Sequence, residues 1–504
     1  MPGTPGARVV LTADRSLMAA YDVLLDGMIA SSQTTTTPWL VMDRLLMPRA
    51  AHPGGRALFA PAGLRRIQAA LLAGGFTDSD VAVVDDAHLR TVIGPETRVI
   101  GVSSGEPTGL GMSSTTMTAV AGGGIYGQVL FERLLGHIRP LREQRAPEAR
   151  IILGGPGAWQ VASDEQTRRR LGVDHVVTGY AEANVAEVFS KLAERAALPP
   201  VIAGLGAPSD AIPPMAGAAA MGSVEVSRGC GMGCGFCTLS TVPMVHLPIE
   251  TVLADARTNL SAGLRAVALL SEDILRYGAR GLQVQPARVI DLLRRLRECD
   301  GLRFIQADHA GIHSVGSYSD AELAEVAALL APDAPPGTAW VNVGVETASG
   351  RLLHAVGCST KMGGVPPEQW GECCATQLER LGHAGFTPMA SLVVGLPGET
   401  AEDLRQTLEW VRGLRGMRVT VFPVLYAPTD GSGPVRGADL RRMHWQLIRE
   451  CYEFNFRWVP TLFSSNQALG GVGALKRGLL QAMGLGQAAL WRSLLAYRQW
   501  RSAQ

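Results

Sequence analysis

Three cysteines carry the clearest chemical signal in this sequence. Cys230, Cys234 and Cys237 follow one another at the spacing C-x3-C-x2-C within the stretch 223–237. Three thiolates can hold three irons of a [4Fe–4S] cube, which normally takes four protein ligands, so one iron stays open to another ligand. The alternatives are a zinc site or three unrelated core cysteines, but no partner Cys or His follows at finger-like spacing. We therefore predict an iron–sulfur cluster with one open iron.

A short apolar strand leads into these cysteines. Val224 and Val226 alternate with polar residues, and the chain then enters a glycine-rich loop. Phe236 is placed to shield a cluster from water, and small residues let the backbone curl around the cube, namely Gly231, Gly233 and Gly235. The stretch resembles the cluster loop of the radical S-adenosylmethionine (SAM) superfamily. This resemblance implies that the open iron chelates the amino and carboxylate groups of SAM.

The composition is that of a soluble enzyme with two or three domains. The chain has 504 residues, of which 47% are hydrophobic and 18% charged, and its formal net charge is +1. This balance provides no basic surface for nucleic acid and no acidic disordered tail. Five of the eight cysteines lie outside the loop without a disulfide-like framework. We expect a cytoplasmic protein, because no stretch has the length of a membrane helix and the N-terminus lacks a signal-peptide pattern.

The first 200 residues alternate short apolar strands with helices. Strands are expected at 7–12, 81–85, 98–103, 150–155 and 175–179, and helices at 64–73, 126–142 and near 185–189. The alternation predicts an α/β fold, with a doubly wound parallel sheet that forms a Rossmann-like domain over residues 1–200. Ligands of such sheets bind at the carboxyl ends of the strands.

Glycines and hydroxyl groups gather at three of these strand ends, in the segments 103–111, 154–157 and 178–182. They let a large ligand approach the backbone closely. Ahead of a radical SAM core, the pattern resembles the cobalamin (B12)-binding domain of the B12-dependent branch, in which the loops after the third and fourth strands hold the nucleotide tail. The resemblance implies cobalamin contacts from Ser103, Gly105, Thr108, Gly154, Gly155, Gly179, Tyr180 and Glu182.

One motif of many B12 domains does not occur after the first strand. The motif is Asp-x-His-x-x-Gly, whose histidine ligates cobalt from below, but residues 12–17 read Thr-Ala-Asp-Arg-Ser-Leu. Asp86-Ala-His88 matches it only superficially, since it follows the second strand and has Thr91 in place of glycine. We predict no histidine ligand. Water or a non-ligating side chain would face the lower side of cobalt, with Arg56, Arg65 and Arg66 as candidates and a solvated helix face as the simpler role of each.

A Pro-, Ala- and Gly-rich linker over 201–220 is expected to join a second domain, 221–434. That domain begins with the cluster strand, and further strands are expected at 266–270, 303–307, 340–345, 390–395 and 418–423. Six βα units predict a partial (β/α)6 barrel of the TIM type, whose active site lies at the C-terminal ends of the strands. Residues 435–504 are expected to form a small α-helical C-terminal cap over the active site.

Two carboxylates follow the second barrel strand. Glu272 and Asp273 stand where the superfamily often has Gly-Gly-Glu in contact with the ammonium group of SAM. A carboxylate here is also able to ligate the fourth iron, which would block SAM chelation and favour polar methyl transfer. Both interpretations stay open, and helix N-capping by Asp273 is a third.

A second pair of polar residues follows the third barrel strand. Asp308 and His309 are candidates for substrate binding or proton transfer, because histidine titrates near neutral pH. Tyr426, after the sixth strand, is a candidate for lining the substrate pocket.

The fourth and fifth strand ends resemble SAM-binding segments of the family. Glu346 and Ser349 lie in a Gly-x-Glu-Thr segment that the resemblance places near the ribose and methionine parts of SAM. The run Gly-Leu-Pro-Gly-Glu-Thr begins at Gly395, Leu396 and Pro397, and its backbone is expected to flank the adenine.

Taken together, the motifs resemble the B12-dependent radical SAM methyltransferases, and most of all the tryptophan C2-methyltransferases of thiopeptide biosynthesis. The grounds for this choice are the compact length, the absent B12 histidine and the carboxylates after the second barrel strand. The resemblance implies a [4Fe–4S] cluster, cobalamin (as methylcobalamin) and SAM. SAM would methylate cob(I)alamin, methylcobalamin would methylate the indole carbon, and a base would remove one proton.

The expected partners are a small-molecule or amino-acid substrate, tryptophan-like by preference, and an electron donor such as flavodoxin or ferredoxin. No nucleic acid and no membrane are expected. Three alternatives stay open: a radical methylase of an unactivated sp3 carbon, a B12 radical SAM cyclase or rearrangement enzyme, and a non-catalytic B12 or Fe–S sensor.

Overall fold

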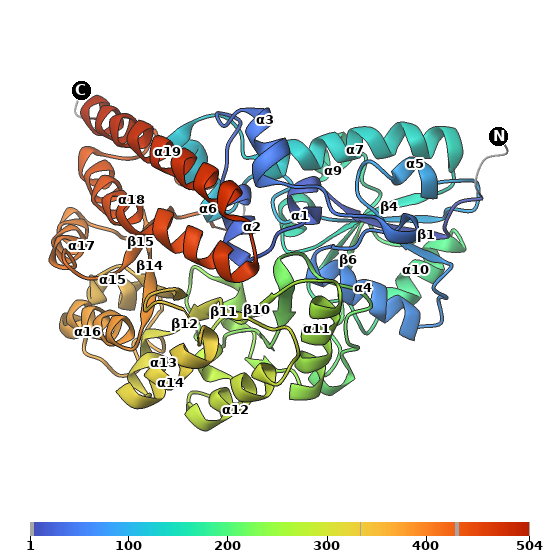
Figure 1. Ribbon diagram of the computed structural model, residues 1–504. Coiled ribbons are helices and arrows are strands. Elements are labelled where there is room, and N and C mark those ends of the chain that lie inside the picture. Colours follow the sequence, from blue (N-terminus) through green and yellow to red (C-terminus); the bar gives the residue numbers. More distant parts are fainter. Residues whose placement is uncertain (1–4, 333, 429–432, 503–504) are drawn as a thin grey trace.

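The computed structural model describes residues 5–332, 334–428 and 433–502. Its first part is a six-stranded parallel sheet in the order β2-β1-β3-β4-β5-β6 (Figure 1). The strands are β1 (Val9–Ala13), β2 (Val81–Val83), β3 (Val99–Ser103), β4 (Arg150–Gly154), β5 (His175–Thr178) and β6 (Val201–Ala203). The central strands β1 and β3 are buried along their whole length, as expected for strands covered on both faces.

Helices cover both faces of this sheet. One hydrophobic core lies between the sheet and α4 and α10, and a second lies on the opposite face against α5, α7, α8 and α9. The helices of this part are α1 (Arg15–Met18), α2 (Leu24–Ser31), α3 (Trp39–Val41), α4 (Ala62–Ala73), α5 (Leu89–Val92), α6 (Met112–Ala121), α7 (Tyr126–Arg145), α8 (Trp159–Ala162), α9 (Glu165–Leu171) and α10 (Val185–Ala193). The expected doubly wound sheet is confirmed. Its sixth strand, β6, pairs with β5 and uses residues expected to begin the linker.

The second part contains the six expected parallel strands in barrel order. They are β7 (Ser223–Glu225), β10 (Ala266–Leu270), β11 (Phe304–Ala307) with its continuation β12 (His309–Ala310), β13 (Ala339–Glu346), β14 (Phe386–Val394) and β15 (Thr420–Leu425). The hydrogen-bonded ladder is interrupted at Asp308, so β7, β10 and β11 form one sheet and β12 to β15 another. β7 and β15, the first and last strands, lie at the edges of these two sheets and are not paired with each other, so the barrel is a partial one.

Helices connect the strands around the outside of this barrel (Figure 1). They are α11 (Ile249–Ser261), α12 (Pro286–Arg297), α13 (Ile312–Gly316), α14 (Asp320–Leu330), α15 (Gly350–Ala355), α16 (Trp370–His383) and α17 (Ala401–Gly413). Shorter helical turns are the π-helix Met42–Leu46 and the 3₁₀ helices Pro53–Gly55, Ser209–Ala211, Ala220–Gly222, Thr238–Thr241, Ile274–Arg276 and Pro367–Gln369.

Two long helices, α18 (Arg442–Gly470) and α19 (Ala474–Arg501), complete the described chain and lie side by side. We expected them to cap the active site, but α18 packs along β15, the last strand of the barrel. The side chain of Asn455 bonds both the N–H and the C=O of Val421, at 2.9 and 2.8 Å. These groups would otherwise be unpaired at a sheet edge, so α18 seals the open side of the barrel.

The aromatic residues of α18 serve this packing. Tyr452 and Phe454 are buried, and the ring of Tyr452 lies 5.3 Å from that of Trp491 in α19. In the ranges that the structure describes, no helix combines the length and the apolar character needed to cross a membrane.

The sheet and the barrel are joined by buried polar contacts. Arg66 of α4 forms an ion pair with Asp255 of α11 at 2.6 Å, and both side chains are buried. Asp255 also accepts from the N–H of Met215 in the connecting segment. On the other side, the N–H of Leu425 at the end of β15 donates to Thr116 of α6 at 2.7 Å. These contacts fix the carboxyl ends of both sets of strands relative to each other.

Candidate functional site

The cysteine loop lies between the short strands β8 (Ser227–Arg228) and β9 (Val245–His246), which pair antiparallel. The N–H of Cys230 donates to the carbonyl of Val242, and the N–H of Gly233 donates to that of Ser240, each at 3.0 Å. Gly229, Gly231 and Gly233 have φ values of +72°, +70° and +71°, which side chains disfavour. The loop therefore has a fixed curled backbone, as its glycines predict.

A fourth cysteine lies beside this loop. The Cys358 thiol is buried just after α15, and its interaction with Cys234 lowers the pKa of Cys234 to about 7. A thiolate is the form that binds iron. Burial instead raises the pKa of Cys230 and of Cys237. The sequence did not indicate Cys358, because it lies far along the chain from the loop.

The donor set of the loop fits a multi-iron cluster better than a single ion. Sulfur ligands of one zinc ion lie roughly 3.8 Å apart when the coordination is tetrahedral. In the described part of the chain, the three loop thiols do not form a group whose atoms all lie within 4.8 Å of one another. Wider spacing suits a cube whose irons each take one cysteine.

The structure separates the two neighbouring carboxylates. Asp273 is buried and accepts a hydrogen bond from Ser314 Oγ at 2.5 Å, and it makes no side-chain capping bond to its helical turn. Glu272 is solvent-accessible yet surrounded by protein, and this partial desolvation raises its pKa. Its charge also raises the pKa of both Cys230 and Cys237. Asp273 raises the pKa of Cys230 as well, so both carboxylates act on the cysteine loop, and Glu272 is the exposed one of the two.

Asp308 and His309 lie on the same mouth of the barrel as Glu272. Nδ1 of His309 is 3.1 Å from Oδ1 of Asp308, and the histidine side chain is 45% exposed. Burial alone would lower the pKa of His309, but Asp308, Glu272 and Glu346 outweigh it and raise that pKa to about 9. His309 is therefore a cation at neutral pH, which favours electrostatic binding over proton abstraction.

A buried lysine lies next to the Gly-x-Glu segment. Glu346 ends β13 with a φ of +66°, a left-handed conformation that is unusual for a residue with a side chain. Lys361 donates to its carboxylate, and both side chains are at most 16% exposed. Burial lowers the pKa of Lys361, but Glu346 and the nearby thiols raise it to a larger extent. The sequence does not predict a role for Lys361, since nothing in the local pattern marks this lysine as buried.

Ser349, the second candidate in the Gly-x-Glu segment, makes hydrogen bonds within the protein. Ser349 Oγ accepts from the N–H of Leu352, which caps α15, and donates to Asp403 at 2.6 Å. Its contact with SAM stays a prediction.

The fifth and sixth strand ends meet the cysteine loop through an apolar cluster. Leu396 is buried in this cluster, and Phe236 and Tyr426 pack against it. Gly395 has a φ of +82°, and Pro397 is exposed. The shielding role expected for Phe236 thus has a structural basis, and Tyr426 lies beside the loop.

The strand ends of the first sheet leave room at the backbone. A Cβ added to Gly105 or Gly154 would meet no atom within 4 Å, whereas one on Gly155 would lie 2.6 Å from Ser103 Oγ. Ser103 and Ser104 are both buried, and in the described ranges Ser104 Oγ has no hydrogen-bond partner. An open glycine cradle with an unsatisfied buried hydroxyl fits a ligand that approaches the backbone. Ser104 was not singled out from the sequence.

The remaining candidates at this edge make internal contacts. Thr108 donates twice to Gln160, through its N–H at 3.0 Å and its hydroxyl at 2.8 Å. Gly179 has a φ of +81° and space around it.

Glu182 forms a buried ion pair with Arg228 of β8 at 2.6 Å, and the Arg228 guanidinium lies 4.0 Å from the centre of the Tyr180 ring. Burial, Glu225 and Glu272 raise the pKa of Tyr180 to about 12. Tyr180 and Glu182 therefore connect the first sheet to the cysteine loop.

The arginines of α4 are not on a solvated helix face. Arg65 and Arg66 are buried, and Arg65 donates to the carbonyls of Ala57, Leu58 and Ala218. Burial lowers the pKa of Arg65 to about 10. Arg56 is exposed and pairs with Asp78. The expectation of a solvated face is wrong for Arg65 and Arg66, and a position below cobalt stays a prediction for all three.

A comparison with protein families identifies the barrel. Residues 224–411 match the model of the radical SAM superfamily. This part of the chain is a radical SAM domain. The match begins within β7 and covers the cysteine loop, Glu272, His309 and Glu346. It confirms the superfamily resemblance of the cysteine motif.

Curated relatives match part of the chain. The ribosomal protein uS12 methylthiotransferase RimO of Citrifermentans bemidjiense is 24% identical over 255 residues, or 48% of this chain and 52% of that protein. An uncharacterized protein, MK0932 of Methanopyrus kandleri, is 30% identical over 42% of this chain and 38% of its own length. The chain thus spans about half or less of these relatives.

Solved structures match nearly the whole chain. TsrM from Kitasatospora setae, a radical S-adenosylmethionine methyltransferase with cobalamin and a [4Fe–4S] cluster bound, aligns with a TM-score of 0.56 at 15% identity, over 96% of this chain and 99% of that one. The same enzyme with tryptophan and the SAM analogue aza-SAM aligns with a TM-score of 0.53 at 16% identity, over 84% and 75%. The radical SAM domain and the sheet before it therefore share the fold of TsrM.

Proposed function

We propose that this protein is a cobalamin-dependent methyltransferase of the radical SAM type, which transfers a methyl group from SAM to a carbon of an aromatic amino-acid substrate. Methylation of tryptophan at C2 is the best candidate for this reaction. The observation that carries the proposal is the position of Glu272, an exposed carboxylate after β10 whose charge acts on Cys230 and Cys237 of the cysteine loop. The fold shared with TsrM supports it, and in that structure tryptophan is the substrate.

Two sets of residues hold the cofactors in this proposal. Cys230, Cys234 and Cys237 ligate three irons of a [4Fe–4S] cluster. The open backbone at Gly105 and Gly154, with the unsatisfied hydroxyl of Ser104, receives cobalamin. When bound, cobalamin supplies a cobalt centre that carries the methyl group between SAM and the substrate.

Glu272 is proposed to ligate the fourth iron. Its charge raises the pKa of both Cys230 and Cys237 and its side chain is exposed, whereas Asp273 is buried and accepts a hydrogen bond from Ser314. An occupied fourth position leaves SAM without its usual chelating iron, and a methyl cation can then pass without formation of a 5′-deoxyadenosyl radical.

His309 is proposed to bind the carboxylate of the amino-acid substrate. Asp308 holds the Nδ1 side of the ring, and the raised pKa keeps a second proton on the imidazolium. The His309 imidazolium is partly open to solvent, and the carboxylates of Asp308 and Glu272 act on it. An amino acid carries both a carboxylate and an ammonium group, so such a mixture of charges attracts it. Phe236 and Tyr426 supply an apolar surface next to the loop for an aromatic ring.

The competing reaction is radical methylation of an sp3 carbon, with SAM on an open iron. Its support is the Gly-x-Glu segment and the Gly395–Pro397 run, which have the form found in SAM-cleaving members of the superfamily. Under this alternative Glu272 binds the ammonium group of SAM instead of iron.

The experiment is an anaerobic reaction of cluster-loaded protein with cobalamin, a reductant, tryptophan and SAM labelled as CD3. The proposal predicts a tryptophan product heavier by one CD3 group in place of one hydrogen, with the label at an indole carbon. Parallel reactions with indole and with phenylalanine test whether the amino-acid part and the indole are both required. If tryptophan stays unmethylated while cluster and cobalamin are fully loaded, the proposed substrate is wrong.

A further inference from the structure

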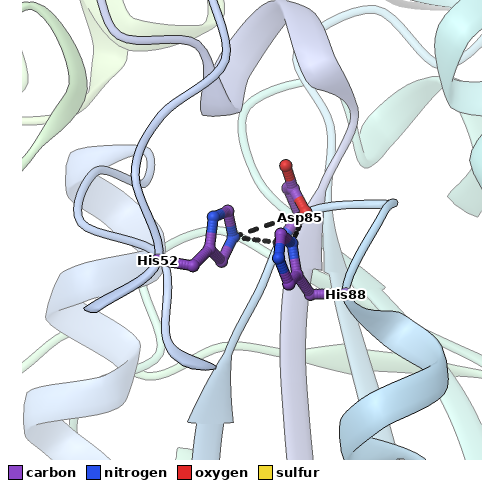
Figure 2. Close-up of side chains that lie close together, drawn as sticks. All are labelled: His52, Asp85 and His88. Atoms are coloured by element: carbon purple, nitrogen blue, oxygen red, sulfur yellow. Dashed lines mark hydrogen bonds and ion pairs between the residues drawn. The ribbon is translucent and has the colours of Figure 1, made fainter. Parts of the chain in front are cut away.

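Two histidines and one aspartate come together away from the barrel, at the carboxyl end of β2, the edge strand of the first sheet (Figure 2). His52 lies in the loop before the turn Pro53–Gly55, and Asp85 and His88 lie in the turn between β2 and α5. The ligand atoms of the three side chains all lie within 4.8 Å of one another. In the described residues, no other group of His, Cys, Asp and Glu does this with three members.

Backbone contacts determine which nitrogen of His52 is protonated. Its Nδ1 lies 3.2 Å from the carbonyl oxygen of Ala50, a group that only accepts, so Nδ1 carries a hydrogen. Nε2 is therefore unprotonated, and its lone pair is engaged only by a long contact of 3.4 Å with the N–H of Asp85, which a metal ion would replace. In metal sites a histidine typically donates one ring N–H to a carbonyl oxygen, while its other ring nitrogen faces the metal and the other ligand atoms.

The distance between the ligand atoms of His52 and Asp85 suits a small cation. Nε2 of His52 is 3.3 Å from Oδ1 of Asp85, which is roughly the separation of two ligand atoms on one tetrahedral zinc ion. A nitrogen lone pair facing a carboxylate oxygen is unfavourable unless a positive charge lies between them. Nδ1 of His88 is 2.7 Å from the same oxygen, and the two imidazole rings stack at 3.7 Å. The 2.7 Å separation is that of a hydrogen bond, so His88 would have to rotate outward in order to share an ion with Asp85.

The other groups around the aspartate orient it. The N–H of Ala87 donates to Oδ1 of Asp85 at 3.1 Å. The Arg49 guanidinium lies 3.6 Å from the second oxygen, Oδ2, and 3.3 Å from Asp86, so one face of the carboxylate is held and the other is directed at the histidines. His52 and Asp85 have side chains only 6% exposed, while that of His88 is 37% exposed. Solvent thus reaches the cluster from the side of His88.

We propose that His52, Asp85 and His88 bind one divalent transition-metal ion, with Zn²⁺ as the ion that the donor set fits best. Two imidazole nitrogens and one carboxylate oxygen are a common set of protein ligands for zinc. Water takes the fourth position on the exposed side. The ion joins the loop before Pro53–Gly55 to the turn after β2. It is separate from the cysteine loop and does not depend on the proposed methyl transfer.

The test is the zinc content of the protein loaded with its cluster and cobalamin. The protein is dialysed against micromolar Zn²⁺ and then against metal-free buffer, and zinc, iron and cobalt are counted separately by mass spectrometry. Zinc belongs to neither cofactor, so its count reports this site alone. We expect one zinc per chain, and a zinc affinity at least about 10 to 100 times weaker in His88→Gln and in Asp85→Asn, because the loss of a ligand costs at least as much as the loss of a residue that orients one. His137→Gln, which removes an exposed histidine of α7, is the matched control and keeps full binding.

Zinc K-edge absorption of the wild-type protein tests the same site without a variant. The expected spectrum has nitrogen and oxygen ligands with the signature of two imidazoles. Sulfur around zinc would place the ion in the cysteine loop and overturn the proposal. So would equal zinc retention by wild type and the His52→Gln/His88→Gln double variant, or no retained zinc in wild-type protein whose iron and cobalt contents are complete.

Discussion

The carboxyl ends of the first sheet and those of the barrel face the same region of the molecule, but their side chains differ in kind. At the ends of β3 and β4 the chain offers glycines, small hydroxyls and empty space. At the ends of the barrel strands it offers charges: Glu272, the Asp308–His309 pair and the Glu346–Lys361 pair. Under the proposed function, the first edge admits a large ligand close to its backbone, and the charges of the second edge act on small ionic groups.

If the proposed function holds, the two α/β parts divide one task. A parallel sheet of either kind presents its loops at the carboxyl edge, so the loops alone decide what is bound. Changes on one edge should therefore impair one cofactor and leave the other in place.

The largest effect is expected from the cysteine loop. Cys234→Ala should abolish methyl transfer and lower the iron content, because a cube held by two cysteines is labile. Cobalamin retention should stay at the wild-type level, since no cysteine of the loop lies on the first sheet. Cys373→Ala on α16 is the control, with normal iron and activity. Methyl transfer by the Cys234 variant would show that the loop is not the cluster site.

The next largest effect is expected at Glu272. Glu272→Gln should lower methyl transfer at least about 100-fold while the iron content stays near normal, since three cysteine ligands remain. The Mössbauer signal of one iron should change, because an amide is a weaker ligand than a carboxylate. Glu298→Gln, an exposed residue after α12, is the control. Unchanged Mössbauer parameters in Glu272→Gln would contradict ligation of iron by Glu272.

A smaller effect is expected from filling the glycine cradle. Gly154→Val adds a side chain where the free protein has space, so the fold should tolerate it. Cobalamin binding, measured by equilibrium dialysis, should weaken by about tenfold or more because the ligand loses that space. Gly473→Val, at another open position, is the control. Normal cobalamin affinity in Gly154→Val would place the ligand elsewhere.

The smallest effect is a pH dependence at His309. Its pKa of about 9 means that the imidazolium is lost as pH rises through 9. The KM for tryptophan should then rise about fourfold between pH 8 and 9.5, with kcat less affected. His309→Gln should remove this rise. A kcat that increases over the same pH range would instead identify His309 as a proton acceptor.

The raised pKa of His309 also makes the stability of the fold depend on pH. Because the folded-state pKa of His309 lies above the ordinary value of 6.5, the protonated histidine stabilises the fold fully below about pH 6.5, and this contribution disappears as pH rises through about 9. Thermal unfolding of wild type and His309→Gln across this range reports the difference.

Local patterns predicted the strands well because each is a short apolar run followed by a turn. The cysteine loop, Glu272 and the glycines of the first sheet were found in this way, since spacing and residue type alone mark them. Pairings between distant segments were not found. Lys361 beside Glu346, Asp255 beneath Arg66, and Asn455 at the edge of β15 depend on packing that no local window contains. The strand β6 was missed because its three residues follow two prolines.

The proposed reaction transfers a methyl group without cleavage of SAM into a radical. The direct measurement is the ratio of S-adenosylhomocysteine, 5′-deoxyadenosine and methylated tryptophan in one anaerobic reaction of the fully loaded wild-type protein. The account predicts one S-adenosylhomocysteine for each methylated product and no 5′-deoxyadenosine. Formation of 5′-deoxyadenosine in proportion to methylated product would contradict it, because SAM would then bind to an open iron that Glu272 does not occupy.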